Sequence, residues 1–203
     1  EHIYTNQTRP YFRAPHLYIA TAARFMPGRR VVSVEAAEAL GGEADYSGDC
    51  SETVLLTSRG ENRYDRTFME GFVRPGPGPE NWTSRNNYAA CGVVPTGPHE
   101  MSMYVQRRCG QTAHYLERLS LRTDGFASVN APYAGGVLLT KPVIFSGKEL
   151  VINYATSAAG SIEVEILGPG GAPLPGYGRE EAGPMVGDEI ERAVAWQGRT
   201  DVS

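Results

Sequence analysis

The sequence contains few cysteines, and their arrangement excludes several kinds of site. Among its 203 residues only Cys50, Cys91 and Cys109 are cysteines. None of their spacings resembles the paired spacing of zinc-binding or redox-active cysteines. We therefore interpret all three as structural thiols, and we expect neither a metal site nor a cofactor.

Long apolar runs and excess positive charge are also absent. No stretch of eighteen apolar residues occurs, so the sequence predicts no membrane-spanning helix. The formal net charge of -4 gives no electrostatic reason to bind nucleic acid or anionic lipid, because both attract clustered lysine and arginine. We expect neither a nucleic acid nor a membrane as a partner.

The first residue is Glu1 rather than methionine, so we expect an N-terminus that was processed or cut. A secretory signal upstream would then not be visible. The Asn-x-Thr sequons at Asn6 and Asn81 suit a secreted protein, although such sequons also occur by chance. The sequence leaves the localisation open, with secretion or the periplasm as candidates.

Glycine and proline are abundant, with 24 and 14 residues, which disfavours helix bundles and coiled coils. A hydrophobic share of 41% is enough for a packed core. Short apolar segments alternate with turns, and this pattern predicts an all-β protein. The one expected helix covers residues 34–40, with Ser33 as its N-cap and Gly41 at its end.

The first 126 residues contain a series of expected strands that occurs twice. The first series includes residues 16–26, 53–57 and 63–68, and the second includes 88–94, 100–106 and 114–121. Their closing turn glycines, Gly60 and Gly125, lie 65 residues apart. A repeated unit of about four strands is typical of a propeller blade, so residues 1–126 are predicted to form about two blades of a partial β-propeller.

Residues 127–203 have fewer charged side chains, and their apolar and polar residues alternate more regularly. Strands are expected at 140–145 and 150–154, which flank a short hairpin turn, and at 161–167 and 193–196. This half is predicted to be part of an antiparallel β-sandwich. Because a closed propeller needs at least four blades and a sandwich about seven strands, we expect the chain to be an internal piece of a longer protein.

Several motifs resemble one superfamily. Residues 11–18, Tyr-Phe-Arg-Ala-Pro-His-Leu-Tyr, resemble the blade-opening motif of five-bladed propeller glycosidases, which include invertases, levanases and arabinanases. Residues 57–60 resemble their recurring blade turn. Residues 121–126, with 135–136, 140–142 and 145–147, are similar to the passage from the last blade to the C-terminal sandwich in bacterial proteins placed with glycoside hydrolase family 32. The resemblance implies a carbohydrate-active glycoside hydrolase or a part of one.

The chain departs from these families where they carry a catalytic acid, because Arg13 and Ala14 stand at the acidic positions of the blade-opening motif. Glycoside hydrolysis needs two carboxyl groups across the scissile bond. Asp49 is the candidate catalytic residue in this chain, since it precedes an apolar strand and would lie at a blade rim. The alternative is a solvated surface charge. A second carboxylate is expected upstream, so the chain alone is predicted to be inactive.

The expected substrate-binding residues are Arg13, His16, Arg85 and Asn86, because fixed donors beside a ring such as Tyr88 suit sugar hydroxyls. The alternative is that the arginines form ion pairs and the asparagine stabilises a turn. The expected partner is therefore a carbohydrate. Two other hypotheses stay open, namely a non-catalytic glycan-binding propeller and a structural or adhesion β protein.

Overall fold

The structure is a computed structural model that describes residues 1–203. Strands hold 36% of the residues and helices 9%, which confirms the all-β class. None of the helices combines the length and the apolar character that crossing a bilayer requires. The chain forms two compact units, Glu1–Arg122 and Thr123–Ser203. The sequence predicts this boundary four residues later, after residue 126.

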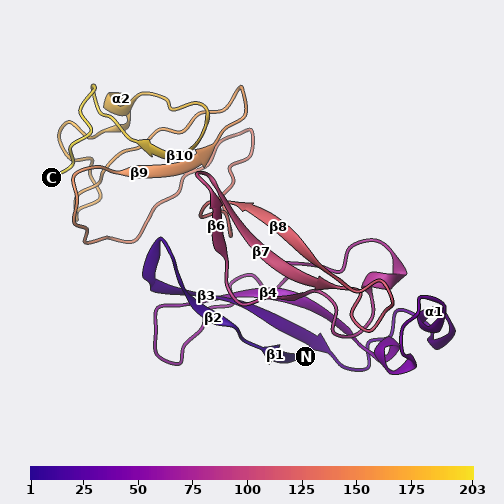
Figure 1. Cartoon of the computed structure of the whole chain (residues 1–203). Coiled ribbons are helices and arrows are strands. Elements are labelled where there is room, and N and C mark those ends of the chain that lie inside the picture. The colour runs from indigo at the N-terminus through magenta and orange to yellow at the C-terminus, as the bar shows by residue number, and fades with distance from the viewer. The chain divides into compact units, whose positions relative to one another are not determined.

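The first sheet has a long central strand, β3 (Ala14–Met26), as Figure 1 shows. Along one edge of β3 lie β1 (His2–Thr5) and β2 (Thr8–Tyr11), and along the other lies β4 (Cys50–Ser58), all antiparallel to it. Beyond β4, isolated bridges join Thr53 to Val73 and Thr57 to Asp65. The expected strand at residues 63–68 does not form, because only Asp65 of this segment pairs with a neighbouring strand.

The second sheet has the same layout around β7 (Glu100–Arg107). Its broken first strand consists of β5 (Tyr88–Ala89) and β6 (Val94–Gly97), and its last strand is β8 (Tyr115–Arg122). The pair Ala22–Val54 in the first sheet corresponds to Met103–Leu119 in the second. The sequence repeat is therefore confirmed as a repeat of strand layout, and the first residues of β4 and β8 lie 65 positions apart.

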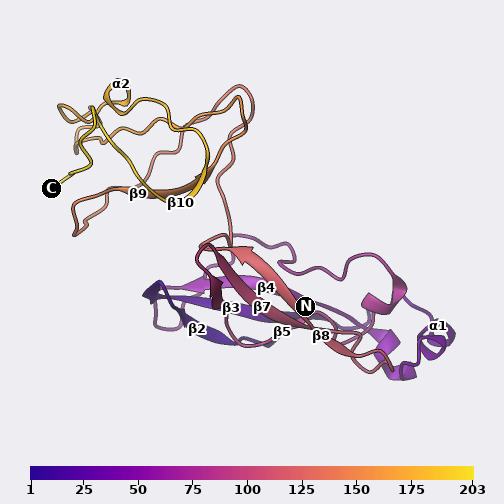
Figure 2. The same cartoon turned by 45° about the horizontal axis from the view of Figure 1, so that its top comes forward.

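The two sheets contact each other face to face within the first unit (Figure 2). The Thr21 hydroxyl lies 3.4 Å from the Ala90 carbonyl, and the Thr53 hydroxyl donates to the Asn87 carbonyl at 2.5 Å. On the second sheet, Met101 and Met103 are fully buried between the layers. Hydroxyl side chains on the first sheet therefore contact backbone carbonyls that flank β5 in the second.

The two sheets also stack with the same orientation of their corresponding faces. Leu119 shares its face of the second sheet with Met103, which packs in the cluster between the layers. Its counterpart in the first sheet is Val54, which lies on the face opposite Thr53 and joins a separate buried cluster with Ala22. Corresponding faces of the two repeats therefore point in one direction, so the second sheet is stacked on the first and not mirrored.

The connections between corresponding strands differ in length. Residues 27–49 join β3 to β4 and carry α1 (Val34–Ala39) and the 3-10 helix η1 (Ala44–Gly48). The expected helix and its cap are confirmed, since the Ser33 hydroxyl accepts a hydrogen bond from the Ala36 amide at 3.1 Å. Residues 108–114 alone join β7 to β8. Between the sheets, residues 59–87 include the 3-10 helix η2 (Pro79–Asn81).

The second unit pairs β9 (Val151–Ala155) with β10 (Asp188–Ala193) and has one short helix, α2 (Arg179–Ala182). Its core surrounds Trp196, whose indole nitrogen donates to the Val164 carbonyl at 3.1 Å. Residues 161–167 form isolated bridges instead of the expected strand. Their apolar side chains still point inward, because the alternation places Ile162, Val164 and Ile166 on one side.

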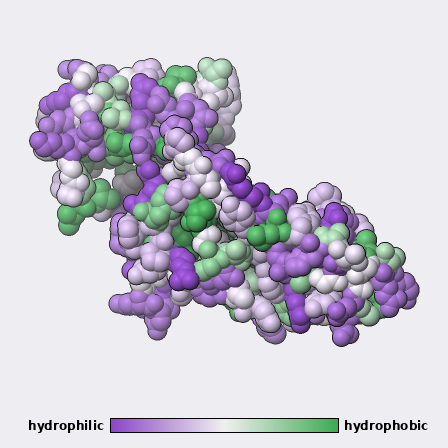
Figure 3. Space-filling model, in the orientation of Figure 1, coloured by the Kyte–Doolittle hydropathy of each residue, from purple (hydrophilic) through white to green (hydrophobic).

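The strand expected at residues 140–145 does not form. Every residue from 127 to 149 is exposed, and residues 140–145 form no β-bridge with another segment. Figure 3 shows hydrophobic and hydrophilic residues intermixed over the visible face of the chain. Apolar content in the sequence was therefore not enough to specify a strand, since a strand needs a partner edge as well.

Candidate functional site

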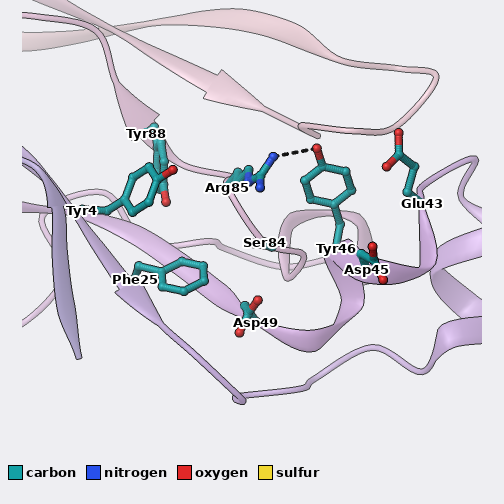
Figure 4. A pocket seen from close by; sticks show the side chains of 9 residues that line it. All are labelled: Tyr4, Phe25, Glu43, Asp45, Tyr46, Asp49, Ser84, Arg85 and Tyr88. Atoms are coloured by element: carbon teal, nitrogen blue, oxygen red, sulfur yellow. Dashed lines mark hydrogen bonds between the residues drawn. The ribbon is translucent and has the colours of Figure 1, made fainter.

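A pocket opens in the first unit beside the end of β3, with a volume of about 420 Å³ (Figure 4). Four segments line it. They are the N-terminal strand, the end of β3, the connection that carries η1, and the residues that lead into β5. The lining residues are Tyr4, Phe25, Glu43, Asp45, Tyr46, Asp49, Ser84, Arg85 and Tyr88.

Three aromatic side chains form one wall of the pocket. The ring centroids of Tyr4 and Phe25 lie 5.9 Å apart, and those of Tyr4 and Tyr88 also lie 5.9 Å apart, with the rings tilted. Burial raises the pKa of the Tyr88 phenol to about 12, and the neighbouring Ser51 opposes the rise only in part. Tyr88 therefore stays neutral at physiological pH.

Carboxylates come from the connection between β3 and β4. Glu43 is the N-cap of η1, Asp45 lies in its first turn, and Asp49 is its C-cap. One oxygen of Asp49, Oδ1, accepts a hydrogen bond from the Gly28 amide at 2.7 Å. The short helix thus places three acidic side chains around the pocket.

Arg85 is the only basic residue that lines the pocket. Its Nη1 donates to the Tyr46 hydroxyl at 2.8 Å, and its Cζ lies 4.9 Å from the centroid of the same ring. In Figure 4 the guanidinium points toward Tyr46 and away from Tyr4 and Phe25. Arg85 therefore closes the pocket between the aromatic wall and η1.

The backbone at Arg85 has φ 61°, a left-handed conformation that is uncommon for residues other than glycine. Hydrogen bonds hold the segment in this conformation. Gln106 Nε2 donates to the Arg85 carbonyl at 2.8 Å, and the Ser84 amide donates to the Tyr46 carbonyl at 2.7 Å. The surrounding structure thus fixes the position of the arginine before any ligand arrives.

Asn86 takes part in the scaffold behind the pocket rather than in its lining. The side chain is fully buried, and its amide nitrogen donates to the Thr83 hydroxyl at 2.7 Å and to the Glu80 carbonyl at 3.0 Å. Its Oδ1 accepts from the Cys109 amide at 2.6 Å. All of these groups are used within the protein, so the structure gives Asn86 the turn-stabilising role that had been its alternative.

Arg13 and His16 lie far from this pocket. Both are exposed near the start of β3, whereas Phe25 lines the pocket near the end of the same strand. At roughly 3.3 Å per residue, His16 and Phe25 are about 30 Å apart along the strand. The five residues expected to form one site therefore separate, and only Asp49 and Arg85 meet in the pocket.

Sequence reasoning missed most of the lining, although it had noted the Tyr88 ring. Glu43, Asp45 and Tyr46 lie in a connection whose counterpart in the second sheet is short. Aligning the two repeats would have isolated this insertion as the part that differs. Tyr4 carried no such signal, because an aromatic residue in a strand is more often part of a core.

The structure contains no cluster of metal-ligating side chains and no disulfide. Within residues 1–203, no three side chains of histidine, cysteine, aspartate or glutamate gather closely enough to hold a metal ion. All three cysteines are free thiols, and burial raises the pKa of both Cys50 and Cys109, which keeps them protonated. A carbohydrate site of side chains alone is compatible with this arrangement.

Comparison of the chain with models of protein families, with curated proteins and with solved structures gives no match.

Proposed function

We propose that the first unit binds a carbohydrate in the pocket between the end of β3, η1 and the start of β5. The observation that carries the proposal is the combination of an aromatic wall with fixed carboxylate and guanidinium groups in one cavity of about 420 Å³. Small-ligand sites typically combine apolar walls with a few well-placed polar groups. A cavity of this size accommodates one or two sugar rings.

The chemistry of the lining suits a sugar. The faces of Tyr4, Phe25 and Tyr88 offer apolar surface against which the C–H face of a pyranose or furanose ring packs. Carboxylates accept hydrogen bonds from hydroxyl groups, and the Arg85 guanidinium donates to ring or hydroxyl oxygens. The rigid segment around Arg85 lowers the entropic cost of binding, because its donor is already oriented.

The same proposal includes the architecture. Two like sheets that stack in one sense, each with a broken first strand and a β3- or β7-type central strand, are what consecutive propeller blades require. The pocket then lies beside the first strands of both sheets of the first unit, through Tyr4 on β1 and Tyr88 on β5. The resemblance to propeller glycosidases supports this interpretation but does not by itself assign an activity.

Glycoside hydrolysis is the second candidate, and one observation favours it. Asp49 shares the pocket with Asp45 and Glu43, so more than one carboxyl group surrounds the space that a glycosidic bond would occupy. In this alternative Asp49 is the catalytic carboxylate. We place binding first, because Arg13 and Ala14 replace the acid of the related motif.

The test is isothermal titration calorimetry on the full chain with four tetrasaccharide-sized probes. They are a fructo-oligosaccharide, an arabino-oligosaccharide, cellotetraose and the tetramer of glucosamine. At least one probe should bind, and Tyr88→Ala and Arg85→Ala should each weaken that binding by fivefold or more, about 1–3 kcal/mol. Arg59→Ala is the matched control, since Arg59 is exposed in the turn after β4.

The outcomes separate the alternatives. Binding that is equally strong in Tyr88→Ala and Arg85→Ala would place the ligand elsewhere and would contradict the proposed site. Release of reducing sugar that Asp49→Asn abolishes would establish the hydrolase instead of the binding module. If no probe binds at millimolar concentration, the proposed function fails.

A further inference from the structure

The charges around the pocket are unbalanced, and this imbalance bears on which sugar it accepts. Glu43, Asp45 and Asp49 contribute three negative charges, and Arg85 contributes the one positive charge among the lining residues. The Nη1 of this arginine donates to the Tyr46 hydroxyl, and its Cζ lies over the ring of the same tyrosine, so part of its charge is used within the protein. The remaining space is therefore negative in potential and is bordered by aromatic rings.

The part of the pocket beside the aromatic wall combines one carboxylate with three aromatic rings. Asp49 and the rings of Tyr4, Phe25 and Tyr88 line it, and Figure 4 shows the guanidinium of Arg85 turned away from it. Only Oδ1 of Asp49 accepts a hydrogen bond within the protein, from the Gly28 amide, so Oδ2 is available to a ligand. Because the Tyr88 phenol has a pKa of about 12, it presents a neutral ring rather than a second anion.

A carboxylate beside several ring faces is the environment that recognises an ammonium group. Ring faces carry partial negative charge and attract cations within about 6 Å of the ring centroid. A carboxylate supplies a charge-assisted hydrogen bond to the same group. A neutral hydroxyl in this place would gain less from either contact, and a carboxylated sugar would be repelled.

Resting on the carbohydrate site proposed above, we propose that its ligand is an amino sugar with a free, protonated amine. The ammonium group lies beside Asp49 and the ring of Phe25, and the sugar ring packs along Tyr4 and Tyr88. The outer carboxylates, Glu43 and Asp45, add long-range attraction to a positively charged oligosaccharide. Binding involves no covalent step.

The test compares three β-1,4-linked tetrasaccharides that differ only at C2, namely the tetramers of glucosamine, of N-acetylglucosamine and of glucose. Titration calorimetry of the full chain at pH 6 should give about tenfold tighter binding for the glucosamine tetramer than for the other two. The preference should shrink as the salt concentration rises from 20 to about 300 mM, because salt screens charges that are partly exposed.

Asp49→Asn isolates the charge with little change of shape. This variant should reduce the preference for the glucosamine tetramer, measured as the ratio of its affinity to that of the glucose tetramer in the same variant, to about threefold or less. Glu61→Gln is the control, since Glu61 is exposed in a loop that does not line the pocket and its replacement changes the net charge of the chain equally. It should keep the full preference.

Each result bears on one proposal. Equal affinity for the three tetramers, lost in Tyr88→Ala, would overturn the amine preference and leave the carbohydrate site standing. A glucosamine preference that Asp49→Asn retains would also overturn the inference, because the charge would then act elsewhere on the chain. If none of the three tetramers binds, the amine preference fails, and the carbohydrate site fails with it only if the fructo- and arabino-oligosaccharides do not bind either.

Discussion

The two sheets of the first unit share a strand layout, and they differ in their connections. In the first sheet, residues 27–49 separate β3 from β4 and provide the acidic residues and Tyr46 of the pocket. In the second, residues 108–114 join β7 to β8 and do not line this pocket. The repeat supplies a rigid frame, and the longer connection supplies the chemistry, as is common for sites built on loops.

The sheets also differ in how their faces are covered. In the first sheet, residues on both faces are buried, such as Val54 on one and Thr53 on the other. In the second sheet, Met103 is buried toward the first, whereas Leu116 is 63% exposed on the opposite face. Stability should therefore depend strongly on one face of the second sheet and weakly on the other.

The largest expected effect is on that difference between faces. Met103→Ala should lower the free energy of unfolding by about 2–5 kcal/mol, because it removes buried contacts between the sheets and leaves a cavity. Leu116→Ala on the exposed face should change it by less than about 0.5 kcal/mol. Urea denaturation followed by circular dichroism measures both. Similar losses in the two variants would contradict the one-sided packing of the second sheet.

A smaller effect is expected at the segment that precedes the second sheet. Asn86→Ala should destabilise the chain by about 2 kcal/mol, since the buried Cys109 amide then lacks its acceptor. Asn130→Ala, in the exposed part of the second unit, is the matched control and should be nearly neutral. Thermal unfolding of the three proteins compares them. A neutral Asn86→Ala would show that this asparagine is dispensable for the scaffold.

The connection of the first sheet has a helix that the second lacks, so its cap can be tested alone. Ser33→Ala removes the acceptor for the Ala36 amide and should cost about 1 kcal/mol in the local stability of α1. Hydrogen exchange of the α1 amides should speed up about fivefold, while the amides of β7 keep their rates. Unchanged exchange in α1 would mean that the cap does not hold the helix.

The last effect concerns the pH dependence of stability and the first strands of the two sheets. Tyr88 opens the second sheet, and its folded pKa of about 12 exceeds the usual value near 10 for an exposed tyrosine. The neutral form is favoured in the folded state, so its contribution to stability is complete below pH 10 and is lost as the pH rises toward 12.

Tyr88→Phe removes this titration. The variant should lose less stability than the parent between pH 10 and 12, measured as the shift in urea midpoint. The absorbance of tyrosinate near 295 nm should show one tyrosine fewer in the latest part of the titration. If parent and variant follow the same pH profile, the phenol is not the group responsible.

The strand pattern was predictable where local signals agreed. The alternation and turns around β3, β4, β7 and β8 predicted these strands, and Ser33 with Gly41 predicted α1. The expected strand at residues 140–145 failed, because apolar residues indicate burial but do not supply a neighbouring edge. Strand pairing is a long-range property, and the local pattern does not contain it.

The candidate site was only half predictable for a similar reason. Asp49 and Arg85 were named from the sequence, and the structure brings them to one pocket. Arg13 and His16 shared their chemistry, but the length of β3 places them about 30 Å from it. Asn86 adjoins Arg85 in the sequence and yet points into the scaffold. Which side chains share a cavity depends on packing between segments that lie far apart in the chain.

The central claim is that the pocket beside η1 binds an oligosaccharide, and an NMR titration tests it most directly. The ¹⁵N-labelled full chain would be titrated with the glucosamine tetramer while its amide resonances are followed. The account predicts shift changes at Phe25, Tyr46, Asp49 and Arg85, and none at His16. Saturable changes confined to the start of β3 or to the second unit, with the pocket amides unmoved, would contradict it.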